Sequence, residues 1–302
     1  MPDLNGVLTN IPNHFTTQFD ANWKHLVQQK NSKLKEYCTL DSIEGKEKSY
    51  NQLDTTSMTQ ITDRSRDTRI SDQAMAKRWI RPLNYDCAKL VDEFDEQFLG
   101  EVVLPTSPII QSHAAAYART CDTIIIGALG GTAFTGTTGT TATALPAGQK
   151  VAVNFVESGT AANSGLTIAK LRRAKFILDA NEVDEEEERI LVVSARQLQD
   201  LLRTVEATSA DYNTVRALVD GNLNTFMGFK FRRTQLLGLT STVRSVYAYV
   251  KSGVILAERG LKTHMDIRTD LSHSLQIRSV ASLGAVRMEE KKVVEIACDE
   301  VI

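Results

Sequence analysis

The glycine-rich stretch GALGGTAFTGTTGTT, residues 127–141, is the part of the sequence whose composition most suggests chemistry, because glycine after an apolar run is typical of phosphate-binding loops. A loop of that kind needs a lysine and a hydroxyl residue directly after its last glycine. Here only threonine and alanine follow, and the first lysine is Lys150. The glycines also miss the G-x-G-x-x-G spacing of dinucleotide sites. The stretch therefore predicts an extended, flexible connection between two packed bodies, and not a nucleotide site.

Other catalytic patterns are also missing from the sequence. It contains neither the G-x-S-x-G turn of serine hydrolases nor the H-E-x-x-H pair of zinc proteases. The five histidines show no metal-ligand spacing, and the four scattered cysteines form no Cys-x-x-Cys pair, which favours reduced thiols over disulfides. We therefore predict no catalytic residue, no cofactor and no metal, and hence a protein that is not an enzyme. An α/β enzyme with a mobile lid is kept as an alternative.

Composition sets further limits on the class of protein. A net charge of −2 over 302 residues excludes the strongly basic surface of a dedicated binder of nucleic acid or of anionic membranes. The N-terminus MPDLNGVLTN has neither the basic nor the apolar part of a secretory signal. No apolar run approaches the roughly 20 residues of a membrane-spanning helix. We expect a chain that is made and kept in a cytoplasm-like compartment and does not enter a membrane.

The first 45 residues have the pattern of an arm. Phe15, Phe19, Trp23 and Leu26 recur at helical spacing, which predicts a helix with one apolar face. The segment that follows is polar and offers no local partner for that face. Two interpretations are open: the helix packs on its own domain, or it lies on a neighbouring subunit.

Residues 46–78 form the least typical segment, because large apolar residues are few and threonine, serine, aspartate and arginine fill the rest. A two-residue alternation in its middle suits an extended ribbon, but a ribbon this polar is marginal by itself in water. The segment is thus either a solvated loop or a hairpin that is stable only when another chain covers it. In the second case, the residues predicted to meet a neighbour are Asp63, Arg64, Arg66, Asp67 and Arg69.

The remaining chain carries helical patterns followed by strand patterns. Helices are predicted over 85–99, from Pro108 to about Leu129, and over 166–180. A short apolar strand is predicted at 189–193, and Ser194 with Gln197 forms a capping box for another helix. From residue 225 onward strands dominate, and the last two apolar runs flank the polar EEKK of 289–292, which predicts a hairpin. The run DEEEE, 184–188, is interpreted as a solvated turn.

Three stretches of this pattern resemble the major capsid proteins of tailed bacteriophages, which share the Hong Kong 97 phage fold. They are RDTRISDQAMAKRWIRPLNYDCAKLVDEFDE (66–96), LTIAKLRRAKFILDANEVDEEEERILVVSARQLQDLL (166–202) and the strand-rich 245–296. The resemblance implies an α+β fold with four parts. These parts are an N-terminal arm (1–45), an extended β-hairpin loop (46–81), a peripheral domain with a long spine helix (82–150 and 263–302) and an axial α/β domain (151–262).

The same resemblance implies a structural function. The chain would self-assemble, as hexamers and pentamers, into the icosahedral head shell that encloses phage double-stranded DNA without sequence-specific binding. Implied partners are a separate scaffolding protein, a portal and a candidate decoration protein. The implied location is the virion, with assembly in the host cytoplasm. Within the same fold, the alternative is the shell of an encapsulin-like cellular compartment.

Overall fold

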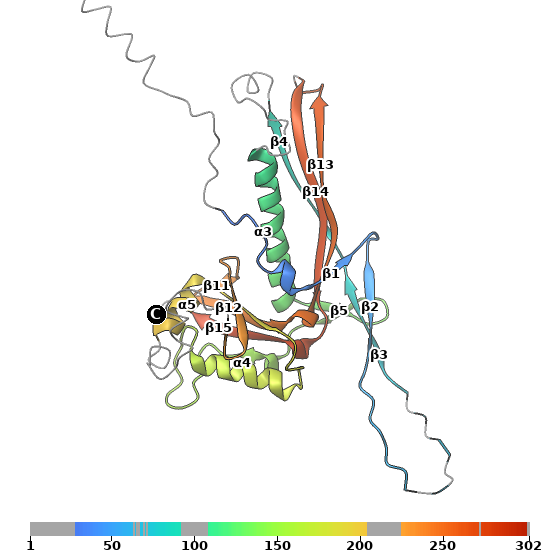
Figure 1. The fold of residues 1–302 in the computed structure, drawn as a ribbon, viewed down its shortest axis with the longest axis vertical. Helices are drawn as coiled ribbons and strands as arrows, with labels where there is room; N and C mark the ends of the chain where they lie inside the picture. Colours follow the sequence, from blue (N-terminus) through green and yellow to red (C-terminus); the bar gives the residue numbers. More distant parts are fainter. Residues whose placement is uncertain are drawn as a thin grey trace, which may run out of the picture.

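The computed structural model describes residues 28–62, 64, 67–68, 70, 72–91, 108–203, 225–271 and 273–300. Within these ranges the chain forms three β-sheets and three α-helices. Figure 1 shows that a long sheet and a long helix extend from a body containing α4 and α5, while the ribbon of β2 and β3 leads away in another direction. The mixture of helices and strands agrees with the α+β class expected from the sequence.

The body is built on a seven-stranded sheet with the order β7-β15-β12-β8-β10-β9, in which β11 also pairs with β12. Strand β8 (Arg189–Val193) is the apolar run RILVV and is buried at every position, as expected of a strand covered on both faces. It confirms the predicted strand. The other strands are β7 (Lys150–Val151), β9 (Thr225–Phe226), β10 (Phe229–Arg233), β11 (Leu239–Thr240), β12 (Val243–Val250) and β15 (Val293–Asp299).

Two helices share the core of this sheet, α4 (Ile168–Ala180) and α5 (Ala195–Arg203). Helix α4 confirms the helix predicted over 166–180. Helix α5 begins with the predicted capping box: Arg196 N donates to Ser194 Oγ at 3.2 Å, and Ser194 N donates to Gln197 Oε1 at 2.9 Å. These bonds satisfy amide groups that have no partner inside the helix.

A four-stranded sheet extends from the body, with the order β1-β13-β14-β4. Helix α3 (Pro108–Gly130) packs along β14 and confirms the long helix predicted from Pro108 (Figure 1). Its buried Ala115 and Ala118 are small, so the helix can approach the sheet closely. The strands are β1 (Thr39–Ser42), β4 (Leu83–Val91), β13 (Val254–Arg268) and β14 (Ser274–Arg287).

The third sheet has the order β2-β3-β5-β6 and joins the base of the extended loop to the glycine-rich stretch. Its strands are β2 (Lys48–Leu53), β3 (Met75–Ile80), β5 (Ala133–Thr135) and β6 (Thr141–Thr143). The prediction of a flexible connection at 127–141 was therefore wrong, because the stretch forms the end of α3 and the β5–β6 hairpin. Gly136 and Gly139 turn the chain there with φ of +89° and +68°, which favours glycine.

Two further predictions are corrected. The helix expected over 85–99 is wrong for 85–91, which lie in β4 and pair with β14 from Leu83 to Val91; residues 92–99 lie outside the described ranges. Pairing with a long neighbouring strand overrides a weak helical spacing. The hairpin expected around EEKK is also wrong, since β14 and β15 join different sheets through the 3-10 turn η5 (Glu290–Lys292).

Sheet membership also bears on the predicted domain boundaries. The segment 263–302, expected to be peripheral, contributes β14 to the long sheet but β15 to the seven-stranded sheet. Lys170 in α4 fixes β15 there, because its buried ammonium group donates to Ala297 O at 2.9 Å and to Ser164 O at 2.7 Å. Burial lowers the pKa of Lys170. The division into peripheral and axial domains stays a prediction.

Candidate functional site

The distal part of the extended loop, residues 54–74, is exposed wherever the structure describes it. Past the strands, one backbone bond (Asp54 N to Ala74 O, 3.0 Å) and one side-chain bond (Gln73 Nε2 to Asp54 O, 3.0 Å) still join its two sides. Figure 1 shows the loop leading away from all three sheets. Its apolar side chains are among the most exposed described, with Met58 fully accessible and Ile61 at 74%. None of the residues that the structure describes covers these side chains.

The residues predicted to meet a neighbour are only partly described. Arg64 and Asp67 are exposed on the loop, which is compatible with such a contact without testing it. The others lie outside the described residues: Phe15, Phe19, Trp23, Asp63, Arg66 and Arg69.

The base of the loop, in contrast, is fixed by a buried ion pair. Arg78 in β3 is 7% exposed, and its guanidinium bonds to Glu290 Oε2 at 2.5 Å. It also donates to Gln52 Oε1 at 3.2 Å, and Gln52 in turn donates to Met288 O at 2.5 Å. Both strands of the loop base are thereby tied to the turn between β14 and β15. Sequence reasoning missed this role of Glu290, because Glu290 lies in the polar run EEKK that was interpreted as the middle of a hairpin.

Arg287 connects the same carboxylate to the end of α3. Its side chain is fully buried, and Nη1 donates to Leu129 O and to Gly131 O, both at 2.9 Å. Nη2 donates to Thr143 O at 3.3 Å and lies 3.7 Å from Glu290 Oε1. A cation at this place satisfies helix carbonyls that lack partners and offsets the negative end of the helix dipole. Burial lowers the pKa of Arg287, and the nearby Glu290 acts against this effect.

The glycine-rich stretch supports the loop base from the other side. Trp79 in β3 donates from Nε1 to Gly136 O at 2.8 Å, and its ring packs so closely on Gly139 that a Cβ there would lie 2.7 Å from it. Arg81 donates to Gly139 O at 3.1 Å and pairs with Glu47 at 3.0 Å. The stretch that resembled a phosphate loop is therefore a packing surface for an indole ring.

The segment 29–34, which falls in the predicted N-terminal arm, is held on α3 by Asp122, a fully buried carboxylate. It accepts hydrogen bonds from the backbone amides of Lys33 (3.0 Å) and Leu34 (3.1 Å) and from the side chains of Gln29 and Ser32. One turn earlier, Arg119 bonds to the Gln29 carbonyl at 3.2 Å. An aspartate inside the otherwise apolar half of a helix (CDTIII) is the sequence signal that could have revealed this anchor.

A second anchor lies just after it. Glu258 in β13 accepts from Lys35 Nζ at 2.7 Å and from Tyr117 OH at 2.6 Å, joining the 3-10 turn η2 (Lys35–Tyr37), β13 and α3. Burial works to raise the pKa of Glu258, but the bonds from Lys35 and Tyr117 leave that pKa below its usual value. Burial and the neighbouring carboxylate together raise the pKa of Tyr117.

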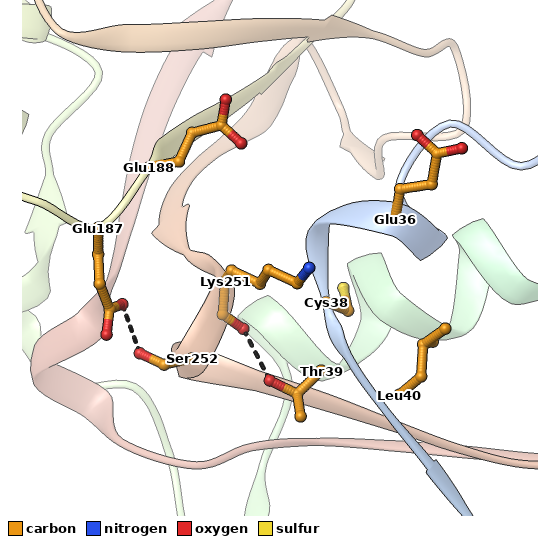
Figure 2. Close-up of a pocket in the computed structure, with 8 residues that line it drawn as sticks. All are labelled: Glu36, Cys38, Thr39, Leu40, Glu187, Glu188, Lys251 and Ser252. Carbon is orange, nitrogen blue, oxygen red and sulfur yellow. Dashed lines mark hydrogen bonds between the residues drawn. The ribbon is translucent and has the colours of Figure 1, made fainter.

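A hollow of about 610 Å³ lies where η2 and β1 meet the 3-10 turn η4 (Lys251–Gly253). It is lined by Glu36, Cys38, Thr39, Leu40, Glu187, Glu188, Lys251 and Ser252 (Figure 2). Burial raises the pKa of Cys38 to about 12, so its thiol is protonated at neutral pH and is a poor nucleophile. Among the described residues, no group of three potential ligand side chains could hold a metal ion, and no helix there is long and apolar enough to cross a membrane.

Comparisons with known proteins point in one direction. The sequence model of a family described as phage capsid protein matches residues 11–300. The fold is similar to the capsid of cyanophage P-SCSP1u, with a TM-score of 0.73 and 16% identity over 96% of this chain and 94% of that one. It is also similar to the head of Helicobacter pylori bacteriophage KHP40, with a TM-score of 0.72 and 10% identity over 96% and 97% of the two chains. A search of curated protein sequences finds no match.

Proposed function

The chain belongs to the phage capsid protein family, has the Hong Kong 97-type capsid fold and is a structural protein of the head shell; from this premise we propose that its extended loop and N-terminal arm join neighbouring subunits. One observation carries the proposal. The loop is locked at its base by Arg78 and Glu290, yet its distal apolar side chains, such as Met58 and Ile61, are exposed. A loop whose base is fixed and whose distal apolar side chains are exposed is suited to contact another copy of the chain.

The contacts proposed within the shell are those expected from the sequence: on the arm Phe15, Phe19 and Trp23, and on the loop Asp63, Arg64, Arg66, Asp67 and Arg69. Each contact can be weak, because a closed shell repeats it at every subunit. The shell would be icosahedral, built of hexamers and pentamers, and would perform no catalysis. It would enclose double-stranded DNA without gripping it, which a net charge of −2 permits.

Further partners follow from the family rather than from any contact described above. We propose a separate scaffolding protein, a portal at one vertex and a candidate decoration protein on the outer surface. Assembly would take place in the host cytoplasm, with the finished protein in the virion. Expression of the chain with and without the neighbouring genes of its genome, followed by electron microscopy of the particles, tests these partners.

The direct test of the loop contact is the double variant Arg64→Glu, Arg66→Glu. Arg64 is exposed, and reversal of charges that are solvated in the single chain should change the free energy of unfolding of the unassembled protein by no more than about 0.5 kcal/mol. If each arginine meets an acidic group of a neighbour, even about 1 kcal/mol lost per contact should abolish particles or make their yield strongly dependent on salt. Lys291→Glu, an exposed reversal outside the loop, is the control.

Particle yield is measured by sedimentation and negative-stain microscopy over a range of salt concentrations, and stability by thermal melting. Normal yield of particles from the double variant at every salt concentration would show that the loop arginines do not join subunits. A wild-type protein that forms no particles under any condition, including coexpression with its genomic neighbours, would contradict self-assembly itself.

A further inference from the structure

The hollow beside η4 combines an apolar wall with an acidic rim. Leu40 on its wall is 49% exposed. Figure 2 shows the carboxylates of Glu36 and Glu188 on two sides, with Lys251 directed into the space between them. Glu188 also pairs with Lys230 at 2.5 Å, and Glu187 accepts a bond from Ser252 at 2.6 Å.

The acidic rim continues beyond the lining residues into the run of five acids at 184–188, which was predicted to be a solvated turn and is largely exposed. Three ammonium groups, those of Lys230, Lys251 and Lys292, lie beside these five acids and Glu36; that of Lys292 donates to Ser252 Oγ at 3.0 Å. Acidic side chains therefore outnumber basic ones at the mouth of the hollow. An occupant that fits this site should carry an apolar tip surrounded by positive charge.

Helix α4 presents a surface of that description. Phe176 on its outer side is 58% exposed, although a phenylalanine is usually buried. The guanidinium of Arg173 lies 5.1 Å from the centre of the Phe176 ring and 6.0 Å from that of Phe155. Lys175 beside it is exposed, and Arg172 pairs with Glu157 at 3.0 Å. Arginine and an aromatic ring held in place before binding are typical of residues that dominate the energy of an interface.

We propose that the outer face of α4 of one copy docks into the hollow of the next copy, with Phe176 against Leu40 and with Arg173 and Lys175 facing Glu36 and Glu188. The proposal rests on self-assembly and adds which surfaces meet. Two different, complementary surfaces on one chain make a head-to-tail contact, and such contacts close into rings when the rotation between copies permits. Rings of this kind are what capsomers require.

The occupant is a second copy rather than an unrelated partner because the same chain supplies both complementary surfaces. Within one chain, the α4 face contacts the segment at 155–157, while the hollow is formed by η2, β1 and η4. Docking would bury Phe176 and Leu40 together, two large apolar side chains that are exposed in the single chain.

A charge-swap experiment tests the proposal. We expect that Glu36→Lys with Glu188→Lys, and separately Arg173→Glu with Lys175→Glu, each reduces particle yield by about tenfold or more. The quadruple variant, which restores opposite charges across the contact, should recover most of the yield. The matched control combines the first pair with Lys262→Glu and Arg278→Glu, two exposed cations on the long sheet; it has the same net charge and should not recover.

Particle formation by the wild-type chain shows which of the two proposals has failed, the docking contact or self-assembly itself. If the wild-type chain forms particles but either double variant assembles equally well, or the quadruple variant does no better than its matched control, the contact assigned here is wrong. Thermal melting of each variant, which should stay near that of the wild type, shows that a loss of particles is not a loss of folding.

A second measurement does not depend on charge. In a Cys87→Ser background, which removes the exposed native thiol, Leu40→Cys with Phe176→Cys should give covalent oligomers after mild oxidation of assembled protein. Denaturing gels should show a ladder that ends at the size of a ring, whereas either cysteine alone should give no ladder. Absence of a ladder from assembled particles of the double-cysteine variant would overturn the proposal.

Discussion

The base and the distal part of the extended loop belong to one continuous segment, yet they differ in every respect that stabilises a chain. At the base, Arg78 is buried and bonded to Glu290, and Trp79 packs on the glycine hairpin. In the distal part, Met58 and Ile61 are exposed and backbone pairing ends at Asp54. The difference separates two tasks: the base sets the direction of the loop, and the distal part remains available for another molecule.

The largest effect on folding is expected at the base, from Arg287→Met. This change removes the cation that bonds the last carbonyls of α3 and faces Glu290. Loss of one partner from a buried charged network typically costs about 3–5 kcal/mol. Urea unfolding of unassembled protein should show that loss. Arg278→Met, on the same strand with a half-exposed side chain, should stay within about 0.5 kcal/mol of the wild type; equal effects of the two changes would contradict the role given to Arg287.

The next effect concerns the glycine hairpin that supports Trp79. Gly139→Ala forces a side chain into a backbone with φ of +68° and places its Cβ 2.7 Å from the indole. Strain and overpacking together should cost about 1–3 kcal/mol, measured by thermal melting with a simultaneous shift in tryptophan fluorescence. Gly148→Ala is the matched control, because a Cβ there meets no atom within 4 Å. A melting temperature that falls equally in both variants would argue against close packing on Trp79.

How much of this could be predicted from the sequence differs between the two parts. The scarcity of large apolar residues in 46–78 predicted a segment with little cover, and the described residues of 54–74 are exposed. Whether this segment is a solvated loop or a hairpin covered by another chain stays a prediction. The predictions of β8 and α3 are confirmed, because their long or continuous apolar patterns leave few alternatives. The prediction of a flexible connection at the glycine stretch failed because the partner of Gly139 is Trp79, about 60 residues earlier in the chain.

Buried charges were the part that sequence reasoning missed. Glu290 lies in the polar run EEKK, which was interpreted as the middle of a hairpin, and Arg287 lies at the end of the apolar run before it. Their role depends on the end of α3 and on Arg78, which only the folded chain brings together. The strand β4 was misread for a related reason: most of its side chains are exposed, so its pairing with β14 leaves little trace in the apolar pattern. The spacing of apolar residues indicates which side chains are buried. Neither the buried charged residues nor the mostly exposed strand β4 produces such a spacing.

A smaller effect is expected at Glu258, whose bonds to Lys35 and Tyr117 should contribute less to the free energy of unfolding at acid pH. Because the pKa of Glu258 is lower in the folded protein than its ordinary value of 4.5, its contribution to stability is complete above that value and is lost as the pH falls through the folded pKa. Loss of its bonds to Lys35 and Tyr117 should cost about 1 kcal/mol. Glu258→Gln should therefore lower stability at pH 7 and weaken its fall between pH 5 and pH 3. An unchanged acid limb in urea unfolding curves would show that Glu258 does not titrate in this way.

The smallest effect on folding, and the clearest contrast with the base, is expected from Met58→Ser with Ile61→Ser. Both side chains are exposed, so their removal should change the free energy of unfolding of unassembled protein by no more than about 0.5 kcal/mol. In the shell, however, burial of each against a neighbour would contribute about 1.5–3 kcal/mol when complete, and that contribution recurs at every subunit. Particles should therefore be lost while the melting temperature of the monomer is unchanged. A change that weakened folding would lower both.

Thr55→Ser with Thr56→Ser, in the same exposed stretch, should leave both properties unchanged. If the Met58 and Ile61 variant melts earlier than the wild type, these side chains are covered within their own chain, and the separation of the loop into a fixed base and an available distal part does not hold.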